Sequence, residues 1–372
     1  MRAGLFTNTR PVWFPTTRII RGMGMRHRAR LALVATLAAI GIASSVTLAQ
    51  LDLNDSANKP AEIEPLAAGS LLLDLAVAGD RLVAVGERGH VLISDDQGVT
   101  WRQAKSVPTR VMLTAVFFID AQYGWAVGHD ETILNTVDGG ENWTRSHFAP
   151  EAQQPLLDLW FANRVSGIAV GAYGAYFTTN DGGRNWSSAK FAPPPASKPA
   201  VPMHDGEPAP DEGDLPQDYH LNRIVGVGNR LYVAAEGGQL YRSDDRGASW
   251  RVLPSPYEGS FFGLVPIRGN GLLAFGLRGH LYRSADSGET WTRLESHTTA
   301  MLTDGVTVND LRVVIGGLAG VLLVSGDAGE TFRLTQQDDR KGVSALLPGP
   351  AGAVVVAGEG GVRTVRLDSA GS

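Results

Sequence analysis

The chain has 372 residues, contains no cysteine and is rich in glycine, with 45 residues of that type. The absence of cysteine excludes disulfide bonds, thiolate catalysis and cysteine-bound metal. Seven of the 33 Lys and Arg side chains lie in the first fifty residues, which contain no acidic side chain. The other residues therefore carry 26 basic and 38 acidic side chains, a net charge of −12. Such a surface repels phosphate and argues against nucleic acid as a partner.

Residues 1–49 are predicted to be a secretory leader. The basic stretch RHRAR precedes the apolar run LALVATLAAIGIASSVTLA, which ends in small residues near Ala49, as a signal peptide does at its cleavage site. Met25 stands directly before the basic stretch, so we interpret residues 1–24 as lying upstream of the true start. An uncleaved membrane anchor and a transit peptide are the alternatives, since the apolar run is just long enough to span a bilayer.

An eight-residue phrase recurs six times at a nearly constant interval. Its copies are SDDQGVTW, TVDGGENW, TNDGGRNW, SDDRGASW, SADSGETW and SGDAGETF. The intervals are 42, 43, 64, 41 and 41 residues between the key Asp residues Asp96, Asp138, Asp181, Asp245, Asp286 and Asp327. A period slightly above forty residues, with about four short strands in each unit, is typical of β-propeller blades.

Each unit is predicted to form four antiparallel strands. In the first unit LLLDLAVA, RLVAVG and HVLIS are strands separated by turns, and the phrase leads into a fourth strand, TWRQA. A seventh unit near the C-terminus has three strands but lacks the phrase. We expect residues 61–67 to supply its missing strand, because pairing the first strand with the last closes the ring and removes exposed sheet edges. The predicted fold class is an all-β, seven-bladed β-propeller over residues 61–369, preceded by a linker at residues 50–60.

The one long interval between phrases contains an insertion at residues 190–219, between the third and fourth blades. It is rich in proline and in acidic residues. Proline cannot donate a hydrogen bond to a sheet, so we expect a surface excursion outside the blades that proteases cleave readily.

The phrase is predicted to form the hairpin turn between the third and fourth strands of each blade. There its Ser or Thr and its Asp can bond the backbone N–H groups of the turn, its Gly permits a positive φ, and its aromatic residue packs over the blade. These features resemble the Asp-box, or BNR, repeat of sialidases and other propellers. We favour a structural role over a catalytic one, because a catalytic site rarely needs the same group on every blade. We assign this structural role to the six Asp residues and to the aromatic residues Trp101, Trp143, Trp186, Trp250 and Trp291.

The stretch FFIDAQYGWAVG at residues 117–128, followed by LNTVDGGENW, resembles the repeat of the photosystem II stability/assembly factor family. The likeness extends over about residues 61–369 and is looser from the fifth blade onward, where the Gly-Trp pair is absent. The resemblance implies a lumenal or periplasmic scaffold that binds membrane proteins during assembly. Relatives in non-photosynthetic bacteria imply an accessory role beside large exporters.

A carbohydrate-active, sialidase-like glycoside hydrolase is the enzymatic alternative. Such an enzyme needs three Arg residues for the substrate carboxylate, a Tyr nucleophile with a Glu partner, and an acid/base carboxylate. The first strands of the seven units contain a single Arg, Arg223. We therefore predict that the protein is not an enzyme and that it has no catalytic residues.

Four charged residues share one register at the start of first strands, where the strand enters the central channel. They are Asp74, Asp158, Arg223 and Asp304. They could form an acid pair or a cation site, but we favour the interpretation that each Asp accepts backbone N–H groups of a neighbouring blade. No metal-ligand spacing supports a metal site, and we predict no metal and no cofactor.

The turns between second and third strands differ from blade to blade. In a propeller these turns share a face with the connections between blades, opposite to the Asp phrases. Their charged and histidine residues include Glu87, Arg88, His129, Asp130, Glu131, Arg278, His280 and Glu359. Because variation among otherwise similar blades marks binding sites, we predict that this face binds the partner.

These observations together predict a non-catalytic, exported propeller that acts as a monomeric scaffold. We expect a periplasmic or secreted location, or the thylakoid lumen in a photosynthetic organism. The expected partner is a membrane protein or a membrane-associated complex, and not a nucleic acid.

Overall fold

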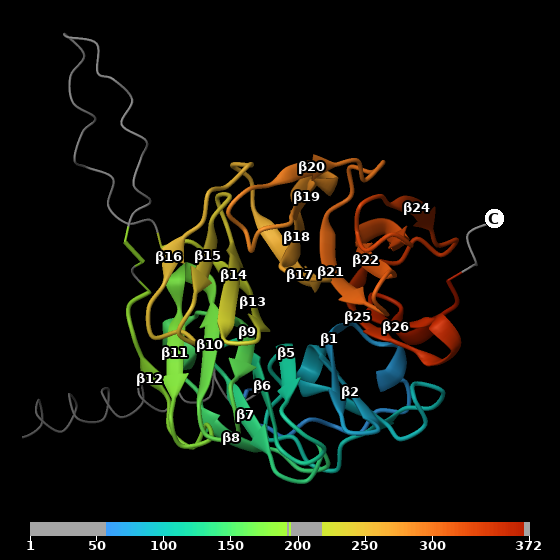
Figure 1. Cartoon of the computed structure of the whole chain (residues 1–372). Coiled ribbons are helices and arrows are strands. Elements are labelled where there is room, and N and C mark those ends of the chain that lie inside the picture. Colours follow the sequence, from blue (N-terminus) through green and yellow to red (C-terminus); the bar gives the residue numbers. More distant parts are fainter. Residues whose placement is uncertain (1–56, 192, 195–217, 368–372) are drawn as a thin grey trace, which may run out of the picture. The chain divides into compact units, whose positions relative to one another are not determined.

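The computed structural model describes residues 57–191, 193–194 and 218–367 (Figure 1). The predicted leader at residues 1–49 and most of the predicted insertion at residues 190–219 lie outside these ranges. Within them the chain forms short strands and single 3-10 turns, and no helix there is long and apolar enough to cross a membrane.

The strands form seven antiparallel sheets, six of four strands and one of three. The first three sheets contain β1 (Leu72–Ala78), β2 (Arg81–Gly86), β3 (Val91–Ser94) and β4 (Arg102–Gln103); β5 (Leu113–Phe118), β6 (Gly124–Gly128), β7 (Ile133–Thr136) and β8 (Thr144–His147); and β9 (Leu156–Phe161), β10 (Gly167–Gly171), β11 (Tyr176–Thr179) and β12 (Ser187–Ser188).

The next two sheets contain β13 (Leu221–Val227), β14 (Arg230–Ala235), β15 (Leu240–Ser243) and β16 (Arg251–Val252), then β17 (Phe261–Ile267), β18 (Gly271–Gly276), β19 (Leu281–Ser284) and β20 (Thr292–Leu294). The last two contain β21 (Leu302–Thr307), β22 (Val313–Gly317), β23 (Val321–Ser325) and β24 (Arg333–Gln336), then β25 (Val343–Pro348), β26 (Val354–Gly358) and β27 (Gly361–Val365). The 3-10 turns are η1 (Ala67–Gly69), η2 (Glu87–Gly89), η3 (Pro150–Ala152), η4 (Ala172–Gly174), η5 (Leu277–Gly279), η6 (Leu318–Gly320) and η7 (Pro350–Gly352).

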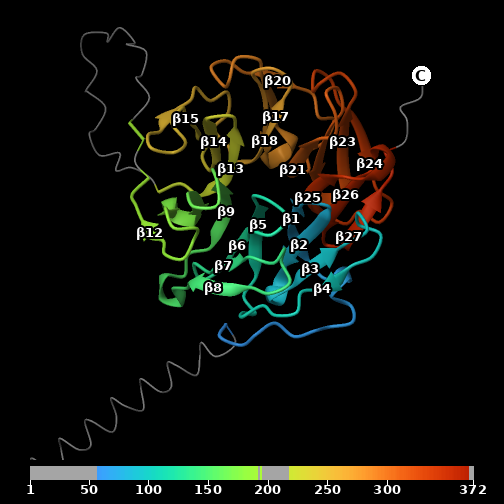
Figure 2. The same cartoon turned by 60° about the horizontal axis from the view of Figure 1, so that its bottom comes forward.

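The sheets follow one another around a central channel as the blades of a propeller (Figures 1 and 2). The first strand of each sheet, which we call the inner strand, contacts the inner strand of the next sheet. The inner strand β1 also contacts β25, so the ring closes between the first blade and the seventh. The predicted seven-bladed β-propeller is therefore confirmed.

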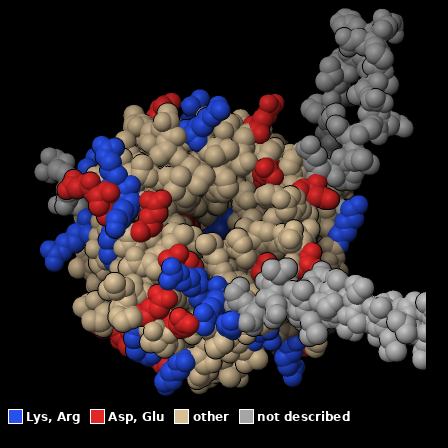
Figure 3. Space-filling model, turned by 180° about the vertical axis from the view of Figure 1, so that it is seen from behind, with Lys and Arg blue, Asp and Glu red and all other residues tan. Residues whose placement is uncertain are grey.

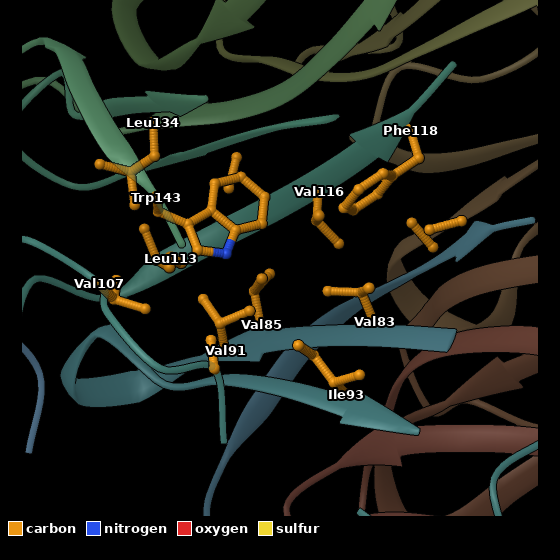
Figure 4. Close-up of a cluster of buried hydrophobic side chains, with 14 of the residues drawn as sticks. Val83, Val85, Val91, Ile93, Val107, Leu113, Val116, Phe118, Leu134 and Trp143 are labelled. Atoms are coloured by element: carbon orange, nitrogen blue, oxygen red, sulfur yellow. The ribbon is translucent and has the colours of Figure 1, made fainter. Parts of the chain in front are cut away.

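Apolar side chains between neighbouring blades form the core. Between the first two blades, Val83 and Ile93 of one blade face Phe118 and Trp143 of the other (Figure 4). The ring of Trp143 meets that of Phe118 edge-on, with 6.0 Å between the ring centroids. Each blade thus covers an apolar face of its neighbour, and removing this surface from water stabilises the ring.

The prediction that residues 61–67 form the fourth strand of the seventh blade is wrong. The seventh sheet has three strands among the described residues, and residues 61–66 form no strand. This segment instead runs beside the first blade: the side chain of Gln103 donates to the carbonyl of Glu62 at 2.9 Å and accepts from the N–H of Glu64 at 2.6 Å. Its backbone groups are therefore engaged there, and Pro65 has no N–H to donate to a sheet.

Residues 57–71, which we call the N-terminal strap, still connect the first blade with the seventh. A Cβ atom on Gly361 would lie 2.0 Å from the carbonyl oxygen of Ala68, so η1 packs directly on the start of β27. At its other end the strap contacts the second blade, where Arg145 of β8 donates to the carbonyl of Ala57 at 3.3 Å. The strap thus joins blades by side-chain and turn contacts where we expected a shared sheet.

Candidate binding sites in the channel and on the turn face

The Asp phrases form hydrogen-bonded turns. In the first, Asp96 accepts hydrogen bonds from the backbone N–H groups of Val99 and Thr100 at 3.1 and 2.8 Å. The hydroxyls of Thr100 and Ser94 also donate to it, at 2.6 and 2.8 Å. These bonds, with those from Thr100 the strongest, hold the pKa of Asp96 at about 2. Trp101 closes the turn by donating its indole N–H to a glycine carbonyl at 3.2 Å.

The other five phrases repeat this arrangement. In each, a hydroxyl donates to the Asp two residues further on, in the pairs Thr136–Asp138, Thr179–Asp181, Ser243–Asp245, Ser284–Asp286 and Ser325–Asp327. Trp143 and Trp186 donate to turn carbonyls as Trp101 does, whereas Trp250 donates to the hydroxyl of Tyr176. Because the carboxylates are bonded within their own turns, this geometry supports a structural role for the phrase.

The four charged residues predicted at the channel lie at equivalent positions of their inner strands. A β-bulge interrupts each strand just before that position, which re-aims the following side chain. The structure brings the four side chains together around one guanidinium. The nitrogens of Arg223 lie 3.7 Å from Asp74, 3.4 Å from Asp158 and 3.2 Å from Asp304.

Each of these Asp residues also binds the backbone of the following blade. The N–H groups that donate to Asp74, Asp158 and Asp304 belong to Val116, Ile224 and Leu346, each at 2.8 Å. This geometry agrees with the interpretation that we favoured from the sequence. The carboxylates therefore link the first blade to the second, the third to the fourth and the sixth to the seventh.

In this cluster the negative charge of Asp74 is only partly stabilised by its neighbours. Burial raises the pKa of Asp74 to about 7, and the attraction of Arg223 offsets only part of that effect. Burial also raises the pKa of Asp158. Burial opposes the charge of Arg223, but attraction by Asp158, Asp304 and Asp74 outweighs it and keeps its pKa above the usual value. A basic side chain is visible inside the central opening (Figure 3).

The turns between second and third strands pack against the connections between blades. A Cβ atom on Gly89 would lie 2.1 Å from the carbonyl oxygen of Thr109, and one on Gly279 would lie 2.0 Å from that of Thr298. Both glycines have a φ of 70°, which favours glycine. Thr109 and Thr298 belong to connections between blades. These turns and connections therefore share one face, which we call the turn face; the Asp phrases lie on the other, the phrase face.

Three of the eight residues predicted for binding on the turn face are glutamates that bond to nearby groups of the fold. Glu87 and Glu359 each accept a backbone N–H from the segment before their own blade, at 3.2 and 2.8 Å. Glu131 is buried and lies 3.1 Å from a ring nitrogen of His147. These three side chains hold turns in place, and a partner has little access to Glu131.

Of the other five, Arg88, His129 and Arg278 are exposed, and Asp130 and His280 are half-buried. Arg88 is exposed and pairs with Glu64 of the strap at 3.2 Å. His280 is half-buried and stacks on Tyr257, with 4.1 Å between the ring centroids; burial, with Arg293 and Arg278 nearby, lowers the pKa of His280. Among the described residues, no ion pair involves His129, Asp130 or Arg278.

Sequence reasoning missed the neighbours of Arg278 and His280. Arg293 and His297 line the same hollow between the fifth and sixth blades. They belong to β20 and to the connection that follows it, and our search considered only the turns between second and third strands. Since connections and turns share a face, the charged residues of the connections should have been included.

Comparison with known proteins points to one group. No family model matches the chain. Over 119 residues it is 29% identical to the photosystem II stability/assembly factor HCF136, chloroplastic, of Cyanidioschyzon merolae (strain NIES-3377 / 10D). The chain is similar to photosystem II stability/assembly factors. The match extends over 32% of this chain and 26% of that relative, so this chain spans about a quarter of the length of the relative.

Solved structures share the fold at low sequence identity. A structure of YCF48 bound to a D1 peptide has a TM-score of 0.63 and 18% identity, over 83% of this chain and 97% of that one. YCF48 from Cyanidioschyzon merolae has a TM-score of 0.60 and 18% identity, over 82% and 97%. The extracellular domain of the putative one component system BT4673 from B. thetaiotaomicron has a TM-score of 0.61 and 12% identity, over 84% and 40%. At these identities the likeness establishes the propeller fold alone.

Proposed function

We propose that the protein is a non-catalytic, exported scaffold that binds a membrane protein or membrane-associated complex and assists its assembly or stability. The observation that carries the proposal is the sequence similarity to a photosystem II stability/assembly factor. The fold likeness to YCF48, which has been solved bound to a D1 peptide, supports a protein partner.

The turn face is the better candidate for the partner site. The phrase face repeats one hydrogen-bonded turn, whereas the turn face carries different side chains on each blade, including exposed Arg88, His129 and Arg278. A rigid scaffold with variable turns is a common arrangement for recognition. Arg278 and Arg293 form no ion pair with any of the described residues and add positive charge to this hollow, so an acidic segment of a partner is favoured there.

We favour a scaffold over a sialidase-like enzyme because of the channel chemistry. The guanidinium of Arg223 is surrounded by three carboxylates at 3.2 to 3.7 Å. It is therefore engaged with negative charge already and is unsuited to hold a substrate carboxylate, which that enzyme class holds with several arginines. Export rests on the basic and apolar leader at residues 1–49, and mass spectrometry of the native protein should find an N-terminus near Gln50. An intact leader would make it an anchored protein.

Capture from solubilised membranes tests the proposed face. The double variant Arg88→Glu, Arg278→Glu reverses two exposed charges on the turn face and should reduce capture of the membrane partner, with a larger effect at low salt. Melting temperatures should stay close to that of the wild type, as surface changes usually do. The matched control is Arg184→Glu, Arg268→Glu, which reverses two exposed arginines on the phrase face.

The two variants give opposite outcomes under the proposal. A membrane protein that wild type and control capture equally, and that the turn-face variant loses, supports it. If instead the control loses the partner and the turn-face variant keeps it, the partner binds the phrase face and our assignment of faces is wrong. If no membrane protein is enriched over a propeller-free resin, the scaffold proposal itself fails.

A further inference from the structure

A cavity of about 400 Å³ lies in the channel, beside Arg223. It is lined by consecutive residues of four inner strands, β1, β5, β9 and β13. Along each strand the lining continues from the charged register position toward the turn that precedes the second strand. The cavity therefore lies on the phrase-face side of the charged cluster, away from the turn face where the partner site is proposed.

The walls of this cavity are apolar and partly uncovered. Phe117, Trp160 and Val225 are half-buried, and Val77 is 46% exposed although it lies on an inner strand. The indole of Trp160 lies so close over β13 that a Cβ atom on Gly226 would be 2.4 Å from its Nε1. This tryptophan belongs to no Asp phrase, and it packs at the edge of the core between the third and fourth blades.

The inner end of the cavity is the carboxylate of Asp74, whose two oxygens have different partners. Asp74 has a side chain only 7% exposed, and its Oδ2 accepts the N–H of Val116. The nearest cation to its Oδ1 is Arg223, at 3.7 Å, which exceeds hydrogen-bond length. Asp158, by contrast, accepts backbone N–H groups on both oxygens. Oδ1 of Asp74 accepts no backbone N–H and is held only by the long contact with Arg223, so it can accept a hydrogen bond from a ligand.

The charges around this end favour a positive ligand. At the same register the seven inner strands place Asp74, Ala115, Asp158, Arg223, Gly263, Asp304 and Ala345. Three carboxylates therefore face one guanidinium, and no other titratable group lies at this level. Because Arg223 stands between the carboxylates, they cannot converge on a metal ion. An anion would meet uncompensated negative charge.

We propose that this cavity binds an ammonium group carried on an apolar stem, either a free alkylamine or a lysine side chain of a partner. The ammonium would donate a hydrogen bond to Oδ1 of Asp74, and the stem would lie along Phe117 and Trp160. Aromatic faces attract cations as well as apolar surface, so the same two rings favour both parts of the ligand. A pocket with apolar walls and a few polar groups at one end is the usual form of a small-ligand site.

The ionisation of Asp74 supports the assignment and gives it a pH dependence. Since burial raises the pKa of Asp74 to about 7, this carboxyl gains its charge between about pH 6 and pH 8. The ligand requires the charged form, and an alkylammonium stays protonated throughout this range. Its affinity should therefore rise by close to tenfold across this window.

Isothermal titration calorimetry with hexylammonium chloride tests the proposal, with hexanol and sodium hexanoate as controls for the stem and for the opposite charge. Wild-type protein should bind hexylammonium in a saturable manner, at least tenfold more tightly than either control. Nα-acetyl-lysine methylamide provides a second arm: binding equal to that of hexylammonium points to a lysine of a partner, and much weaker binding points to a free amine.

Two substitutions separate the site from the fold. Asp74→Asn should reduce hexylammonium affinity at least tenfold and abolish its pH dependence. Asp304→Asn is the matched control, since Asp304 also contacts Arg223 and accepts a backbone N–H but does not line the cavity; it should change affinity less than threefold. Equal losses in both variants, or hexanol binding as tight as hexylammonium binding in the wild type, would overturn the proposal. The comparison of ligands on the wild type remains decisive if a variant does not fold.

Discussion

Asp96 and Asp74 are both aspartates of the first blade, but their surroundings shift their pKa values in opposite directions. Hydrogen bonds from Thr100 and Ser94 lower the pKa of Asp96 to about 2. Burial raises the pKa of Asp74 to about 7. The charged form of Asp96 therefore stabilises the folded protein, whereas the charged form of Asp74 destabilises it. Residue type alone does not distinguish them.

The raised pKa of Asp74 makes the stability of the protein depend on pH. The folded-state value lies above the unfolded value of about 4, so the stabilisation by the protonated form is complete below about pH 4 and is lost as the pH rises through about 7. Asp74→Asn cannot ionise. From about pH 5 to about pH 8, its free energy of unfolding relative to the wild type should therefore rise by about 2 to 3 kcal/mol.

Urea unfolding of both proteins at the two pH values measures this difference. Its sign is the informative part, because a carboxyl that were stabilised in its charged form would give the opposite trend. A relative stability of the variant that falls with pH would show that Arg223 overcomes the effect of burial at Asp74.

The packing and the hydrogen bonds of an Asp phrase should contribute unequally to stability. Trp143 is only 4% exposed and contacts the core between the first two blades, so Trp143→Ala should cost about 3 to 5 kcal/mol. Asp138→Ala removes the acceptor for Thr136 and Asn142 at an exposed turn and should cost about 1 to 2 kcal/mol. Denaturant unfolding gives both values; a larger loss at Asp138 than at Trp143 would contradict the account.

At the scale of elements, the repeated units were predictable from the sequence and the ring closure was not. The six phrases fix the turn between the third and fourth strands, and the apolar strands between them leave little choice of register. A single terminal segment such as residues 61–67 has no such repetition. Its partner depends on which blade offers a matching donor and acceptor, and the side-chain amide of Gln103 provides both on the first blade.

The two candidate sites also differ in how far they could be predicted from the sequence. The channel cluster could be found because Asp74, Asp158, Arg223 and Asp304 occupy one register of a repeat. The hollow beside Arg278 was predicted only in part, because Arg293 and His297 come from an outer strand and a connection, which the prediction did not include. Stacking of blades, which the periodic pattern does not encode residue by residue, places them beside the turn.

The strap should depend strongly on Gln103. Gln103→Ala removes two hydrogen bonds to the strap, so we expect a loss of about 1 to 2 kcal/mol and faster proteolytic cleavage within residues 57–71. Limited proteolysis followed by N-terminal sequencing detects the cleavage. The control is Gln122→Ala, an exposed glutamine in a turn of the second blade. Equal cleavage of the two variants would mean that other contacts hold the strap.

At the scale of the whole molecule, side chains at the channel connect successive blades. Besides the three Asp residues, Thr114, Asn222 and Thr303 donate to inner-strand carbonyls of the following blade at 2.6, 2.8 and 2.6 Å. These bonds and the apolar cores between blades favour a rigid ring. A rigid ring presents its turns with little loss of conformational entropy on binding, as a scaffold requires.

The proposed function divides the molecule into two faces with different tasks, and blade five carries an exposed arginine on each. Arg278 lies in η5 on the turn face, and Arg268 lies in the turn between β17 and β18, on the phrase face. A photo-crosslinking amino acid placed at one or the other position reports which face lies against a partner. Both sites are on the surface, so neither substitution should disturb the core.

The most direct test of the scaffold proposal is photo-crosslinking from these two positions in intact cells, followed by mass spectrometry of the products. We predict that position 278 crosslinks to a membrane protein and that position 268 does not. Crosslinks to a membrane protein from position 268 but not from position 278 would contradict the assignment of the turn face as the binding surface, and none from either position would contradict the scaffold function.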